Sequence, residues 1–405
     1  MLSNATKLRE ISPAEAGSLP LLKERLVALQ STLSKNAVES EQNRRAHEEN
    51  IQAIAEAGAF KLMVPKRFGG MESTIRAHLE VTGILAEGCG GTAWVTALTN
   101  VCAWLSGLYC EQAQNDVFGQ NPEARVAGVF APSSTTLRVS GGLRVSGKWY
   151  SSSGILHAHW AMVGVLELNE QKQVVGHYMA LIPKDDFSID DTWFTSGMRA
   201  SGSNCIVASD VFVPDHRLLN MRAALSSDYA TEFSSETAYQ KPLMPIAALI
   251  LVGAQLGLGR AALKHVLGKA HQRGIAYTNY GRQSDSVIFQ AQVADAAIKL
   301  HTAELLALSA ADEIDACGAD LRKMEYVDRA RIRAITGEVA KTVTDAIDIL
   351  VSAHGAGTFA ESNPLQRYWR DANAAARHAI VLPAVGKEVF GEALLGLESK
   401  VTNLV

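Results

Sequence analysis

Apolar residues recur every three or four positions from Leu19 to about Pro122, and this spacing predicts amphipathic helices. The segments LLKERLVALQSTL (21–33) and NIQAIAEAGAFKLM (50–63) show the spacing most clearly. The stretch from 78 to 109 is more apolar and is expected to form two helices, because Gly88, Gly90 and Gly91 interrupt it. The first third of the chain is therefore predicted to be helical.

The pattern changes to strict alternation of apolar and polar residues at Ala124. TLRVSGGLRVSG (136–147) alternates on both sides of two glycines, which is typical of a β-hairpin. WAMVGVLELNEQKQVVGHYMALIP (160–183) repeats this design around a polar turn, and CIVASDVFVP (205–214) supplies another strand. The middle of the chain is therefore predicted to be a domain of antiparallel strands.

The helical period returns after Pro245 and holds almost to Val405, with interruptions at 276–286 and 353–364. Helices, then strands, then long helices predict an α+β fold and disfavour a Rossmann sheet, in which strands and helices alternate. We therefore expect an N-terminal helical domain at 1–123, a middle β domain at 124–232 and a C-terminal helical bundle at 233–405.

Composition and charge narrow the possible functions. Of the 405 residues 47% are hydrophobic and 20% are charged, and the net charge of −4 comes without any basic block. Nucleic acid is therefore not an expected partner. The longest uncharged stretch, between Pro242 and Arg260, contains Gln255 and several glycines, so it is expected to be a buried core helix rather than a membrane span.

The five cysteines form neither an even set nor a C-x-x-C pair, which predicts reduced thiols in a cytoplasmic protein and no metal framework. The N-terminus MLSNATKLREIS lacks the apolar segment of a signal peptide. These features agree with a cytoplasmic protein without a membrane partner.

Two short motifs have ordinary structural explanations. GLGRAA (257–262) loosely matches a dinucleotide fingerprint, but it lies in a helical run and no acidic residue follows it before Ser284. HAH (157–159) is expected to place two imidazoles on one face of a strand, yet no third metal ligand is near in sequence, so a structural role is favoured.

Three other stretches combine hydroxyl, aromatic and small residues. KWYSSSG (148–154) ends a predicted strand, where alternation would point Ser151 and Ser153 to one face. WFTSGMRASGSN (193–204) is a glycine- and serine-rich loop. PLQRYWRDANAAARHAI (364–380) predicts a helix that places Asp371, two alanines and His378 on one face.

Taken together, VPKRFGG, GMRASGSNCIVASDVFVP and PLQRYWRDA resemble the acyl-CoA dehydrogenase superfamily over nearly the whole chain from about residue 20. The resemblance implies a helical N-terminal domain, a β-barrel-like middle domain and a C-terminal four-helix bundle. It also implies a homotetramer with flavin between the middle domain and the bundle.

The dehydrogenases need a carboxylate base, which takes a proton from the carbon next to a thioester. The two places where the family keeps this glutamate hold Ala247 and Ala379 here. Ser151 replaces a tryptophan of the family pattern, and the usual TE is absent from VAGVFAPSS (126–134). Dehydrogenation of a thioester is therefore not expected.

AEGCGGTAW, YSSSG, SGSNCIVASDVFVPDHR and QRYWRDA with the later RHA are more similar to a branch of the superfamily, the two-component flavin-dependent aromatic monooxygenases. The oxygenase component of 4-hydroxyphenylacetate 3-hydroxylase typifies this branch. The resemblance implies that a separate NAD(P)H-dependent reductase supplies reduced FAD or FMN by diffusion. Oxygen then adds at flavin C4a, and the hydroperoxide passes one oxygen atom to an aromatic substrate.

The resemblance also implies residue roles. Ser153 would face flavin N5, and His378 would lie on the substrate side, where an imidazole can bind or deprotonate a phenol OH or an indole NH. The other implied contacts are Trp193 and Ser201 along the flavin, Trp94 as a wall of the ring or of the substrate, and Arg273 at the flavin phosphate, often across a subunit boundary.

The substrate pocket departs from the phenol hydroxylases of the branch at two positions. Cys102 stands where they carry a histidine and Gly128 where they carry a serine, so the predicted pocket is less polar and larger. An indole-type ring is therefore favoured over a phenol carboxylate. The sequence leaves open the choice between FMN and FAD and whether carbon, nitrogen or sulfur is oxygenated.

Alternatives remain at the level of the sequence. The chain could be an acyl-CoA dehydrogenase-like or nitroalkane-oxidase-like flavoprotein, or a binding protein of the same fold without catalysis. For single residues, the alternatives are core packing for Trp94, a surface ion pair for Arg273 and a structural role for His378.

Overall fold

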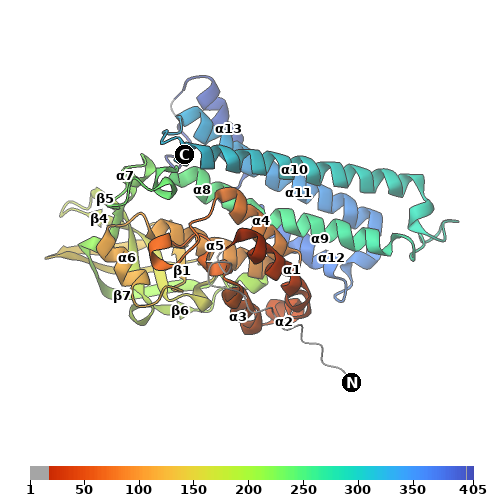
Figure 1. Ribbon diagram of the computed structural model, residues 1–405, viewed down its shortest axis with the longest axis horizontal. Helices are drawn as coiled ribbons and strands as arrows, with labels where there is room; N and C mark the ends of the chain where they lie inside the picture. Colours follow the sequence, from red (N-terminus) through yellow and green to blue (C-terminus); the bar gives the residue numbers. More distant parts are fainter. Residues whose placement is uncertain (1–17, 398) are drawn as a thin grey trace.

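A computed structural model describes residues 18–397 and 399–405 of the chain. Its element order is helices, then strands, then long helices, which confirms the predicted α+β fold. Figure 1 shows the sheets at one end of the molecule and the long C-terminal helices extending away from them as an arm. The domain limits at 123 and 232 stay predictions.

Amphipathic helices make up the N-terminal part, with a buried apolar face on each of the longer ones. The helix expected over 50–63 is shorter than predicted, because Gly58 takes a left-handed conformation with φ 93° and ends it. The helices are α1 (Leu19–Lys35), α2 (Ala37–Gln42), α3 (Glu48–Ala57), α4 (Ile75–Ala86), α5 (Gly90–Ser106) and α6 (Glu111–Phe118).

Helix α5 lies at the centre of the molecule, since every one of its residues except Leu98 is buried. It packs on α4, on the C-terminal bundle and on the first strand of the middle domain. A helix that is apolar on all sides has to be covered on all sides. Helix α5 therefore joins the three parts of the chain, and it carries Trp94 and Cys102.

The described strands form two four-stranded sheets. One sheet has the order β1 (Val126–Val129), β4 (Trp160–Leu168), β5 (Val174–Pro183), β8 (Leu218–Asn220); the other has the order β2 (Ser134–Val139), β3 (Gly142–Trp149), β7 (Cys205–Pro214), β6 (Ser188–Asp190).

The predicted middle domain of strands is confirmed, and it differs from an antiparallel barrel in two details. The strands do not close into one barrel, and β1 pairs with β4 in parallel while the other ladders are antiparallel. The cause is that the β2–β3 hairpin joins the other sheet, so the chain crosses over before it returns beside β1. Apolar residues such as Val145, Trp149, Val163 and Ile206 fill the space between the sheets.

The C-terminal part is a bundle of long helices, as predicted, with two breaks that the sequence reading missed. One lies where Leu321 takes φ 52°, and the other precedes Pro383, which opens the last helix. The helices are α7 (Met221–Leu225), α8 (Leu243–Leu249), α9 (Gly253–Ala270), α10 (Val287–Ala319), α11 (Tyr326–His354), α12 (Pro364–Ala375) and α13 (Pro383–Leu394).

The GLGRAA motif lies inside α9, where it serves helix packing. A Cβ placed on Gly257 would come within 2.1 Å of the carbonyl oxygen of Gly83, so glycine lets α4 and α9 approach closely. Among the described residues, the run Leu243–Ala270 is long and apolar enough to cross a membrane, but 89% of its most apolar window is buried within the protein.

Candidate active site

A cavity of about 950 Å³ lies where α5, β1, α7, α8 and the segment after α12 meet. Three residues predicted for the substrate pocket, Cys102, Gly128 and His378, line it from elements far apart in sequence. A Cβ added to Gly128 would lie 2.9 Å from Cys102 Sγ, so these two residues face each other directly. Because glycine has no side chain and a thiol forms only weak hydrogen bonds, this part of the cavity wall leaves space and is weakly polar.

A chain of hydrogen bonds lies behind His378. The Trp94 ring centroid is 6.0 Å from that of His378, and its Nε1–H donates to Ser153 Oγ at 3.0 Å. Ser153 Oγ is 2.8 Å from Ser203 Oγ, which is 2.7 Å from Ser201 Oγ. The structure thus brings together four of the predicted residues, and adds Ser203, which the sequence reading did not name.

Backbone hydrogen bonds fix the loop after β3 against the loop before β7. The Ser152 N–H donates to the Asn204 carbonyl at 3.1 Å, and the Gly154 N–H donates to the Ser201 carbonyl at 3.2 Å. The Asn204 side-chain oxygen in turn accepts from the Trp193 N–H at 3.0 Å. The two predicted flavin segments are therefore held as one unit.

The predicted alternation of the three serines is wrong. Strand β3 ends at Trp149, and Ser151 takes a left-handed conformation with φ 65°, so the strand period stops before the serines. Ser151 lines the cavity, while Ser153 is buried against Trp94.

The predicted helical face of Asp371 and His378 is also wrong, since α12 ends at Ala375. The His378 N–H donates to the Ala375 carbonyl at 3.1 Å in a tight turn, because the chain must redirect to enter α13. Asp371 instead accepts the Met198 N–H at 2.6 Å and ties the loop before β7 to α12. His378 nevertheless reaches the cavity, from the turn rather than from the helix.

The HAH motif does not lie on a strand. His157 ends a 3₁₀ turn, with Nδ1 3.4 Å from a Glu48 carboxylate oxygen. His159 precedes β4, and its Nδ1 accepts the Arg125 N–H at 2.9 Å. Each ring therefore has a structural partner of its own.

Comparisons with known proteins identify the family of the fold. The family model described as acyl-CoA dehydrogenase, N-terminal domain, matches residues 27–118, and the model for the acyl-CoA dehydrogenase C-terminal domain matches residues 249–383. The structure of XiaF from Streptomyces sp. in complex with FADH2 and glycerol superposes with a TM-score of 0.92 at 36% identity, and covers 96% of this chain and 98% of that one.

Curated relatives are similar over the whole chain. The flavin-dependent monooxygenase oxygenase subunit HsaA of Rhodococcus jostii (strain RHA1) is 32% identical over 380 residues, which cover 92% of this chain and 98% of the relative. The FADH(2)-dependent resorcinol hydroxylase oxygenase component of Rhizobium sp. (strain MTP-10005) is 30% identical over 399 residues, covering 96% and 97%. The chain belongs to the flavin-dependent monooxygenases of the acyl-CoA dehydrogenase superfamily.

The cavity of this monooxygenase holds no carboxylate among its described lining residues. Ala247 and Ala379, which are expected from the sequence to lie near the two places of the dehydrogenase glutamate, both line it. The described lining residues therefore offer no acid side chain that could remove a proton from carbon, and they include the imidazole of His378.

The residues present fit a reduced flavin beside the hydroxyl chain. Trp94 Nε1 can only donate, so it uses one lone pair of Ser153. If Ser153 donates to Ser203 and Ser203 to Ser201, the second lone pair of Ser153 stays free to accept a hydrogen bond. Reduced flavin carries an N–H at N5 that can fill this position.

Burial lowers the pKa of His378 to about 4, so its ring is neutral near pH 7. Its Nδ1 accepts the Ile380 N–H at 3.3 Å, which favours the tautomer with the proton on Nε2. In that form Nε2 donates to a substrate oxygen. To accept a proton at Nε2, the ring must take the other tautomer, which carries its proton on Nδ1 and loses the hydrogen bond from the Ile380 N–H. At 3.3 Å this hydrogen bond is weak, so its loss costs little.

Arg273, predicted as a flavin-binding residue, does not line the cavity. It follows α9 by three residues, at the end of the bundle that Figure 1 shows remote from the sheets. Its guanidinium contacts His354 Nε2 at 2.6 Å, and Gly357 lies directly beside it. Within one chain, Arg273 therefore does not belong to the cavity that His378 lines.

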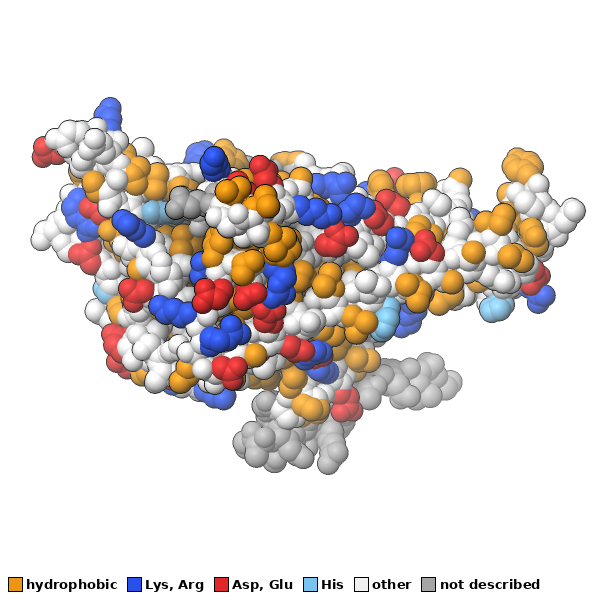
Figure 2. Space-filling model, turned by 90° about the horizontal axis from the view of Figure 1, so that it is seen from above, with side chains coloured by type: hydrophobic (Ala, Val, Ile, Leu, Met, Phe, Trp, Pro, Cys, Tyr) orange, Lys and Arg blue, Asp and Glu red, His pale blue; other side chains and the backbone are white. Residues whose placement is uncertain are grey.

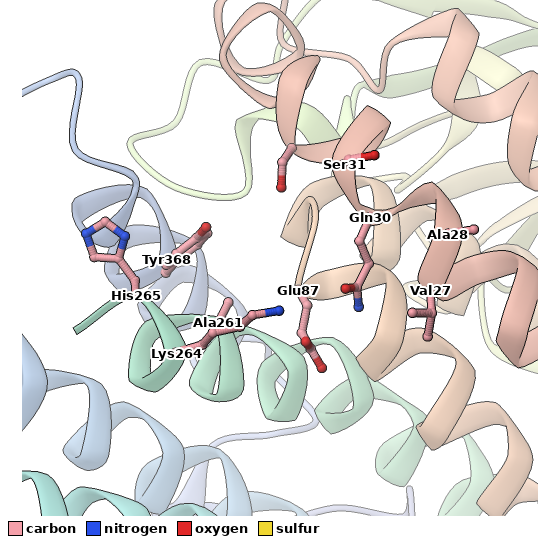
Figure 3. A pocket seen from close by; sticks show the side chains of 10 residues that line it. Val27, Ala28, Gln30, Ser31, Glu87, Ala261, Lys264, His265 and Tyr368 are labelled. Atoms are coloured by element: carbon pink, nitrogen blue, oxygen red, sulfur yellow. The ribbon is translucent and has the colours of Figure 1, made fainter. Parts of the chain in front are cut away.

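A second cavity, of about 460 Å³, lies between α1 and α9 (Figure 3). Gln30 and Ser31 on α1 line one side, and Lys264 and His265 on α9 line the other, with Tyr368 of α12 nearby. None of the residues predicted for flavin or substrate lines it, so it is separate from the candidate active site.

We expect stability to fall as pH drops from about 6.5 to about 4. Burial lowers the pKa of four histidines to about 4, whereas in the unfolded chain a histidine titrates near about 6.5. Below that pH the unfolded chain binds protons that the folded chain excludes, so the folded state loses stability as pH falls through this window. The four are His78, His157, His354 and His378.

Thermal unfolding measured from pH 7.5 to pH 4 tests this expectation. The variant His78→Gln should unfold at a lower temperature at pH 7 but show a shallower loss between pH 6.5 and 4, because one excluded proton is gone. An unfolding temperature that stays constant over this range in the wild type would contradict it.

Proposed function

We propose that this monooxygenase inserts one oxygen atom from O2 into an electron-rich aromatic ring, with reduced FAD or FMN supplied by a separate NAD(P)H-dependent reductase. The observation that carries the proposal is the cavity lined by an imidazole, with a hydroxyl chain behind it and no carboxylate among its described residues. This set suits hydrogen bonding to an OH or NH and does not suit removal of a proton from carbon.

His378 binds the ring substituent in this proposal. The neutral imidazole donates from Nε2 to a phenol oxygen or, in its other tautomer, accepts the proton of a phenol OH or an indole NH. Accepting the proton raises the electron density of the aromatic ring, whereas donating to the oxygen holds the ring in place. Reduced flavin, when bound, would supply the two electrons that activate O2, so that one oxygen atom enters the ring and the other leaves as water.

Ser153 accepts a hydrogen bond from the flavin N5–H through its free lone pair. Keeping that proton in place suppresses the wasteful loss of hydrogen peroxide, because this loss requires the proton to leave. Trp94 holds Ser153 in position and packs beside the imidazole. Trp193 and Ser201, on the loop joined to Ser153 through Ser203, line the flavin.

An indole-type ring fits the inner wall better than a simple phenol acid. Cys102 and Gly128 face each other where the phenol hydroxylases keep a histidine and a serine, and burial raises the pKa of the Cys102 thiol to about 12, so it stays neutral. The wall therefore offers space and little hydrogen bonding to a second ring substituent.

We also propose a homotetramer in the cytoplasm. The α10 face of the arm exposes the side chains of Val287 (71%), Ile288 (74%), Ile298 (65%) and Leu305 (57%), and Figure 2 shows hydrophobic side chains gathered on the arm. In such an assembly Arg273 would reach the flavin phosphate of a neighbouring subunit. All five cysteines are free thiols, which supports a reducing compartment.

The substrate proposal predicts that the purified protein with chemically reduced flavin and O2 oxygenates indole at least about tenfold more efficiently than 4-hydroxyphenylacetate. Product analysis by mass spectrometry with ¹⁸O2 measures this and shows where the oxygen enters. Turnover of the phenol alone would remove the indole preference. No labelled product from any aromatic compound would remove the monooxygenase proposal for this chain.

A further inference from the structure

The cavity has a cationic rim that the proposed chemistry does not use. Arg222 on α7 lines the cavity, is exposed and has no ion pair recorded among the described residues. The described lining residues include no aspartate or glutamate that could neutralise it. A guanidinium at the edge of a largely apolar cavity, without an acidic neighbour in its wall, attracts an anionic group.

His177 lines the same cavity as Arg222. On β5, Tyr178 pairs with Asn220 of β8, so His177 extends one residue beyond that ladder, next to the start of α7. The His177 ring lines the cavity, and its Nε2 has no hydrogen-bond partner among the described residues. Ser226 and Asn403, both exposed, complete the polar part of this rim.

Arg222 and His378 reach the cavity from separate elements, helix α7 and the turn after α12. His378 packs on Trp94 near the start of α5, whereas Tyr109, just beyond its end, donates to the Met179 carbonyl of β5. A molecule that contacts both His378 and Arg222 therefore touches two separate walls of the cavity.

We propose that Arg222, together with His177 of the same cavity, forms an anion subsite that selects aromatic substrates with a carboxylate on a side chain remote from the ring that is oxygenated. The inference rests on the proposed aromatic oxygenation and names its substrate class. The cavity of about 950 Å³ is near the upper end of the range for sites that hold drug-sized ligands, so ring and side chain fit together.

Two sources of the anion are possible in chemical terms, a substrate carboxylate and the phosphate of the flavin itself. The same contact serves either one, so the experiment needs to separate them. Binding measured without oxygen turnover also separates this inference from the proposed reaction.

Calorimetric titration of the protein with indole-3-acetate, indole-3-propionate and indole-3-butyrate, each paired with its amide, is the test. For at least one of the three side-chain lengths, the carboxylate is expected to bind roughly tenfold more tightly than its amide. This is the lower end of the effect of a hydrogen bond to a charged group, because Arg222 is exposed to solvent. Arg222→Gln should remove this preference and Arg222→Lys should keep most of it, with the affinities for FMN and FAD unchanged.

Arg322→Gln is the matched control, since Arg322 is also exposed and lies in the turn between α10 and α11. It should leave the preference unchanged. Carboxylates and amides that bind within about twofold at every length would overturn the inference, even if oxygenation is observed. An Arg222→Gln variant that keeps the carboxylate preference would also overturn the inference, whether or not its affinity for flavin falls.

Discussion

Replacing His378 with alanine is expected to lower the yield of oxygenated product by about 100-fold, the lower end of the effect of removing a general acid–base group. The variant should still bind reduced flavin and consume O2, because Ser153, Ser201 and Trp193 are untouched. The oxygen consumed should then appear as hydrogen peroxide. Product and peroxide measured together, per reduced flavin supplied, check this expectation.

His47→Asn is a suitable control, since His47 caps α3, does not line the cavity, and asparagine can also act as an N-cap. Its product yield should equal that of the wild type. The pH dependence gives a second readout, because a ring with a pKa of about 4 stays neutral above pH 5 and should produce no inflection near pH 6.5. A His378→Ala variant with unchanged product yield would assign the residue a purely structural role.

Replacing Ser153 with alanine is expected to lower the fraction of reduced flavin that yields product by about tenfold, the scale of losing one hydrogen bond to a charged or reacting group. The change also leaves Trp94 Nε1 without its acceptor and cuts the link to Ser203. Hydrogen peroxide should rise by the amount that product falls, while the affinity for the aromatic substrate stays the same.

The neighbouring serine provides the control. Ser152 is fully buried, but its Oγ has no hydrogen-bond partner among the described residues. Ser152→Ala therefore removes a hydroxyl of the same loop and leaves the hydrogen bonds of Ser153 in place. Its coupling should match the wild type. Equal peroxide release from Ser153→Ala and Ser152→Ala would show that the hydroxyl of Ser153 does not control oxygen use.

The sequence predicted well those elements whose backbone hydrogen bonds join residues close together along the chain. The β2–β3 hairpin turns at Gly141, as the alternation on both sides of it indicates, and α1 follows its apolar period. The parallel pairing of β1 with β4 left no such signal, because partner choice depends on where the intervening hairpin lies.

The candidate site shows the same division. The resemblance to a known family indicated Cys102, Gly128 and His378, and the structure places all three on one cavity. It did not reveal that α12 ends before His378, because the end is imposed by the approach to α13. The sequence did not indicate Arg222 and His177, because neither belongs to a motif and only the folded chain places them on the cavity.

The two ends of the cavity come from separate pieces of the chain. The end near His378 is held by the hydroxyl chain and by backbone bonds between two loops, whereas the rim near Arg222 is carried by α7, a five-residue helix. Changes in α7 can therefore accumulate without disturbing the flavin contacts. Enzymes built this way can diversify in what they accept while the oxygen chemistry is inherited unaltered, and α7 is the natural first segment to randomise when a new substrate is wanted.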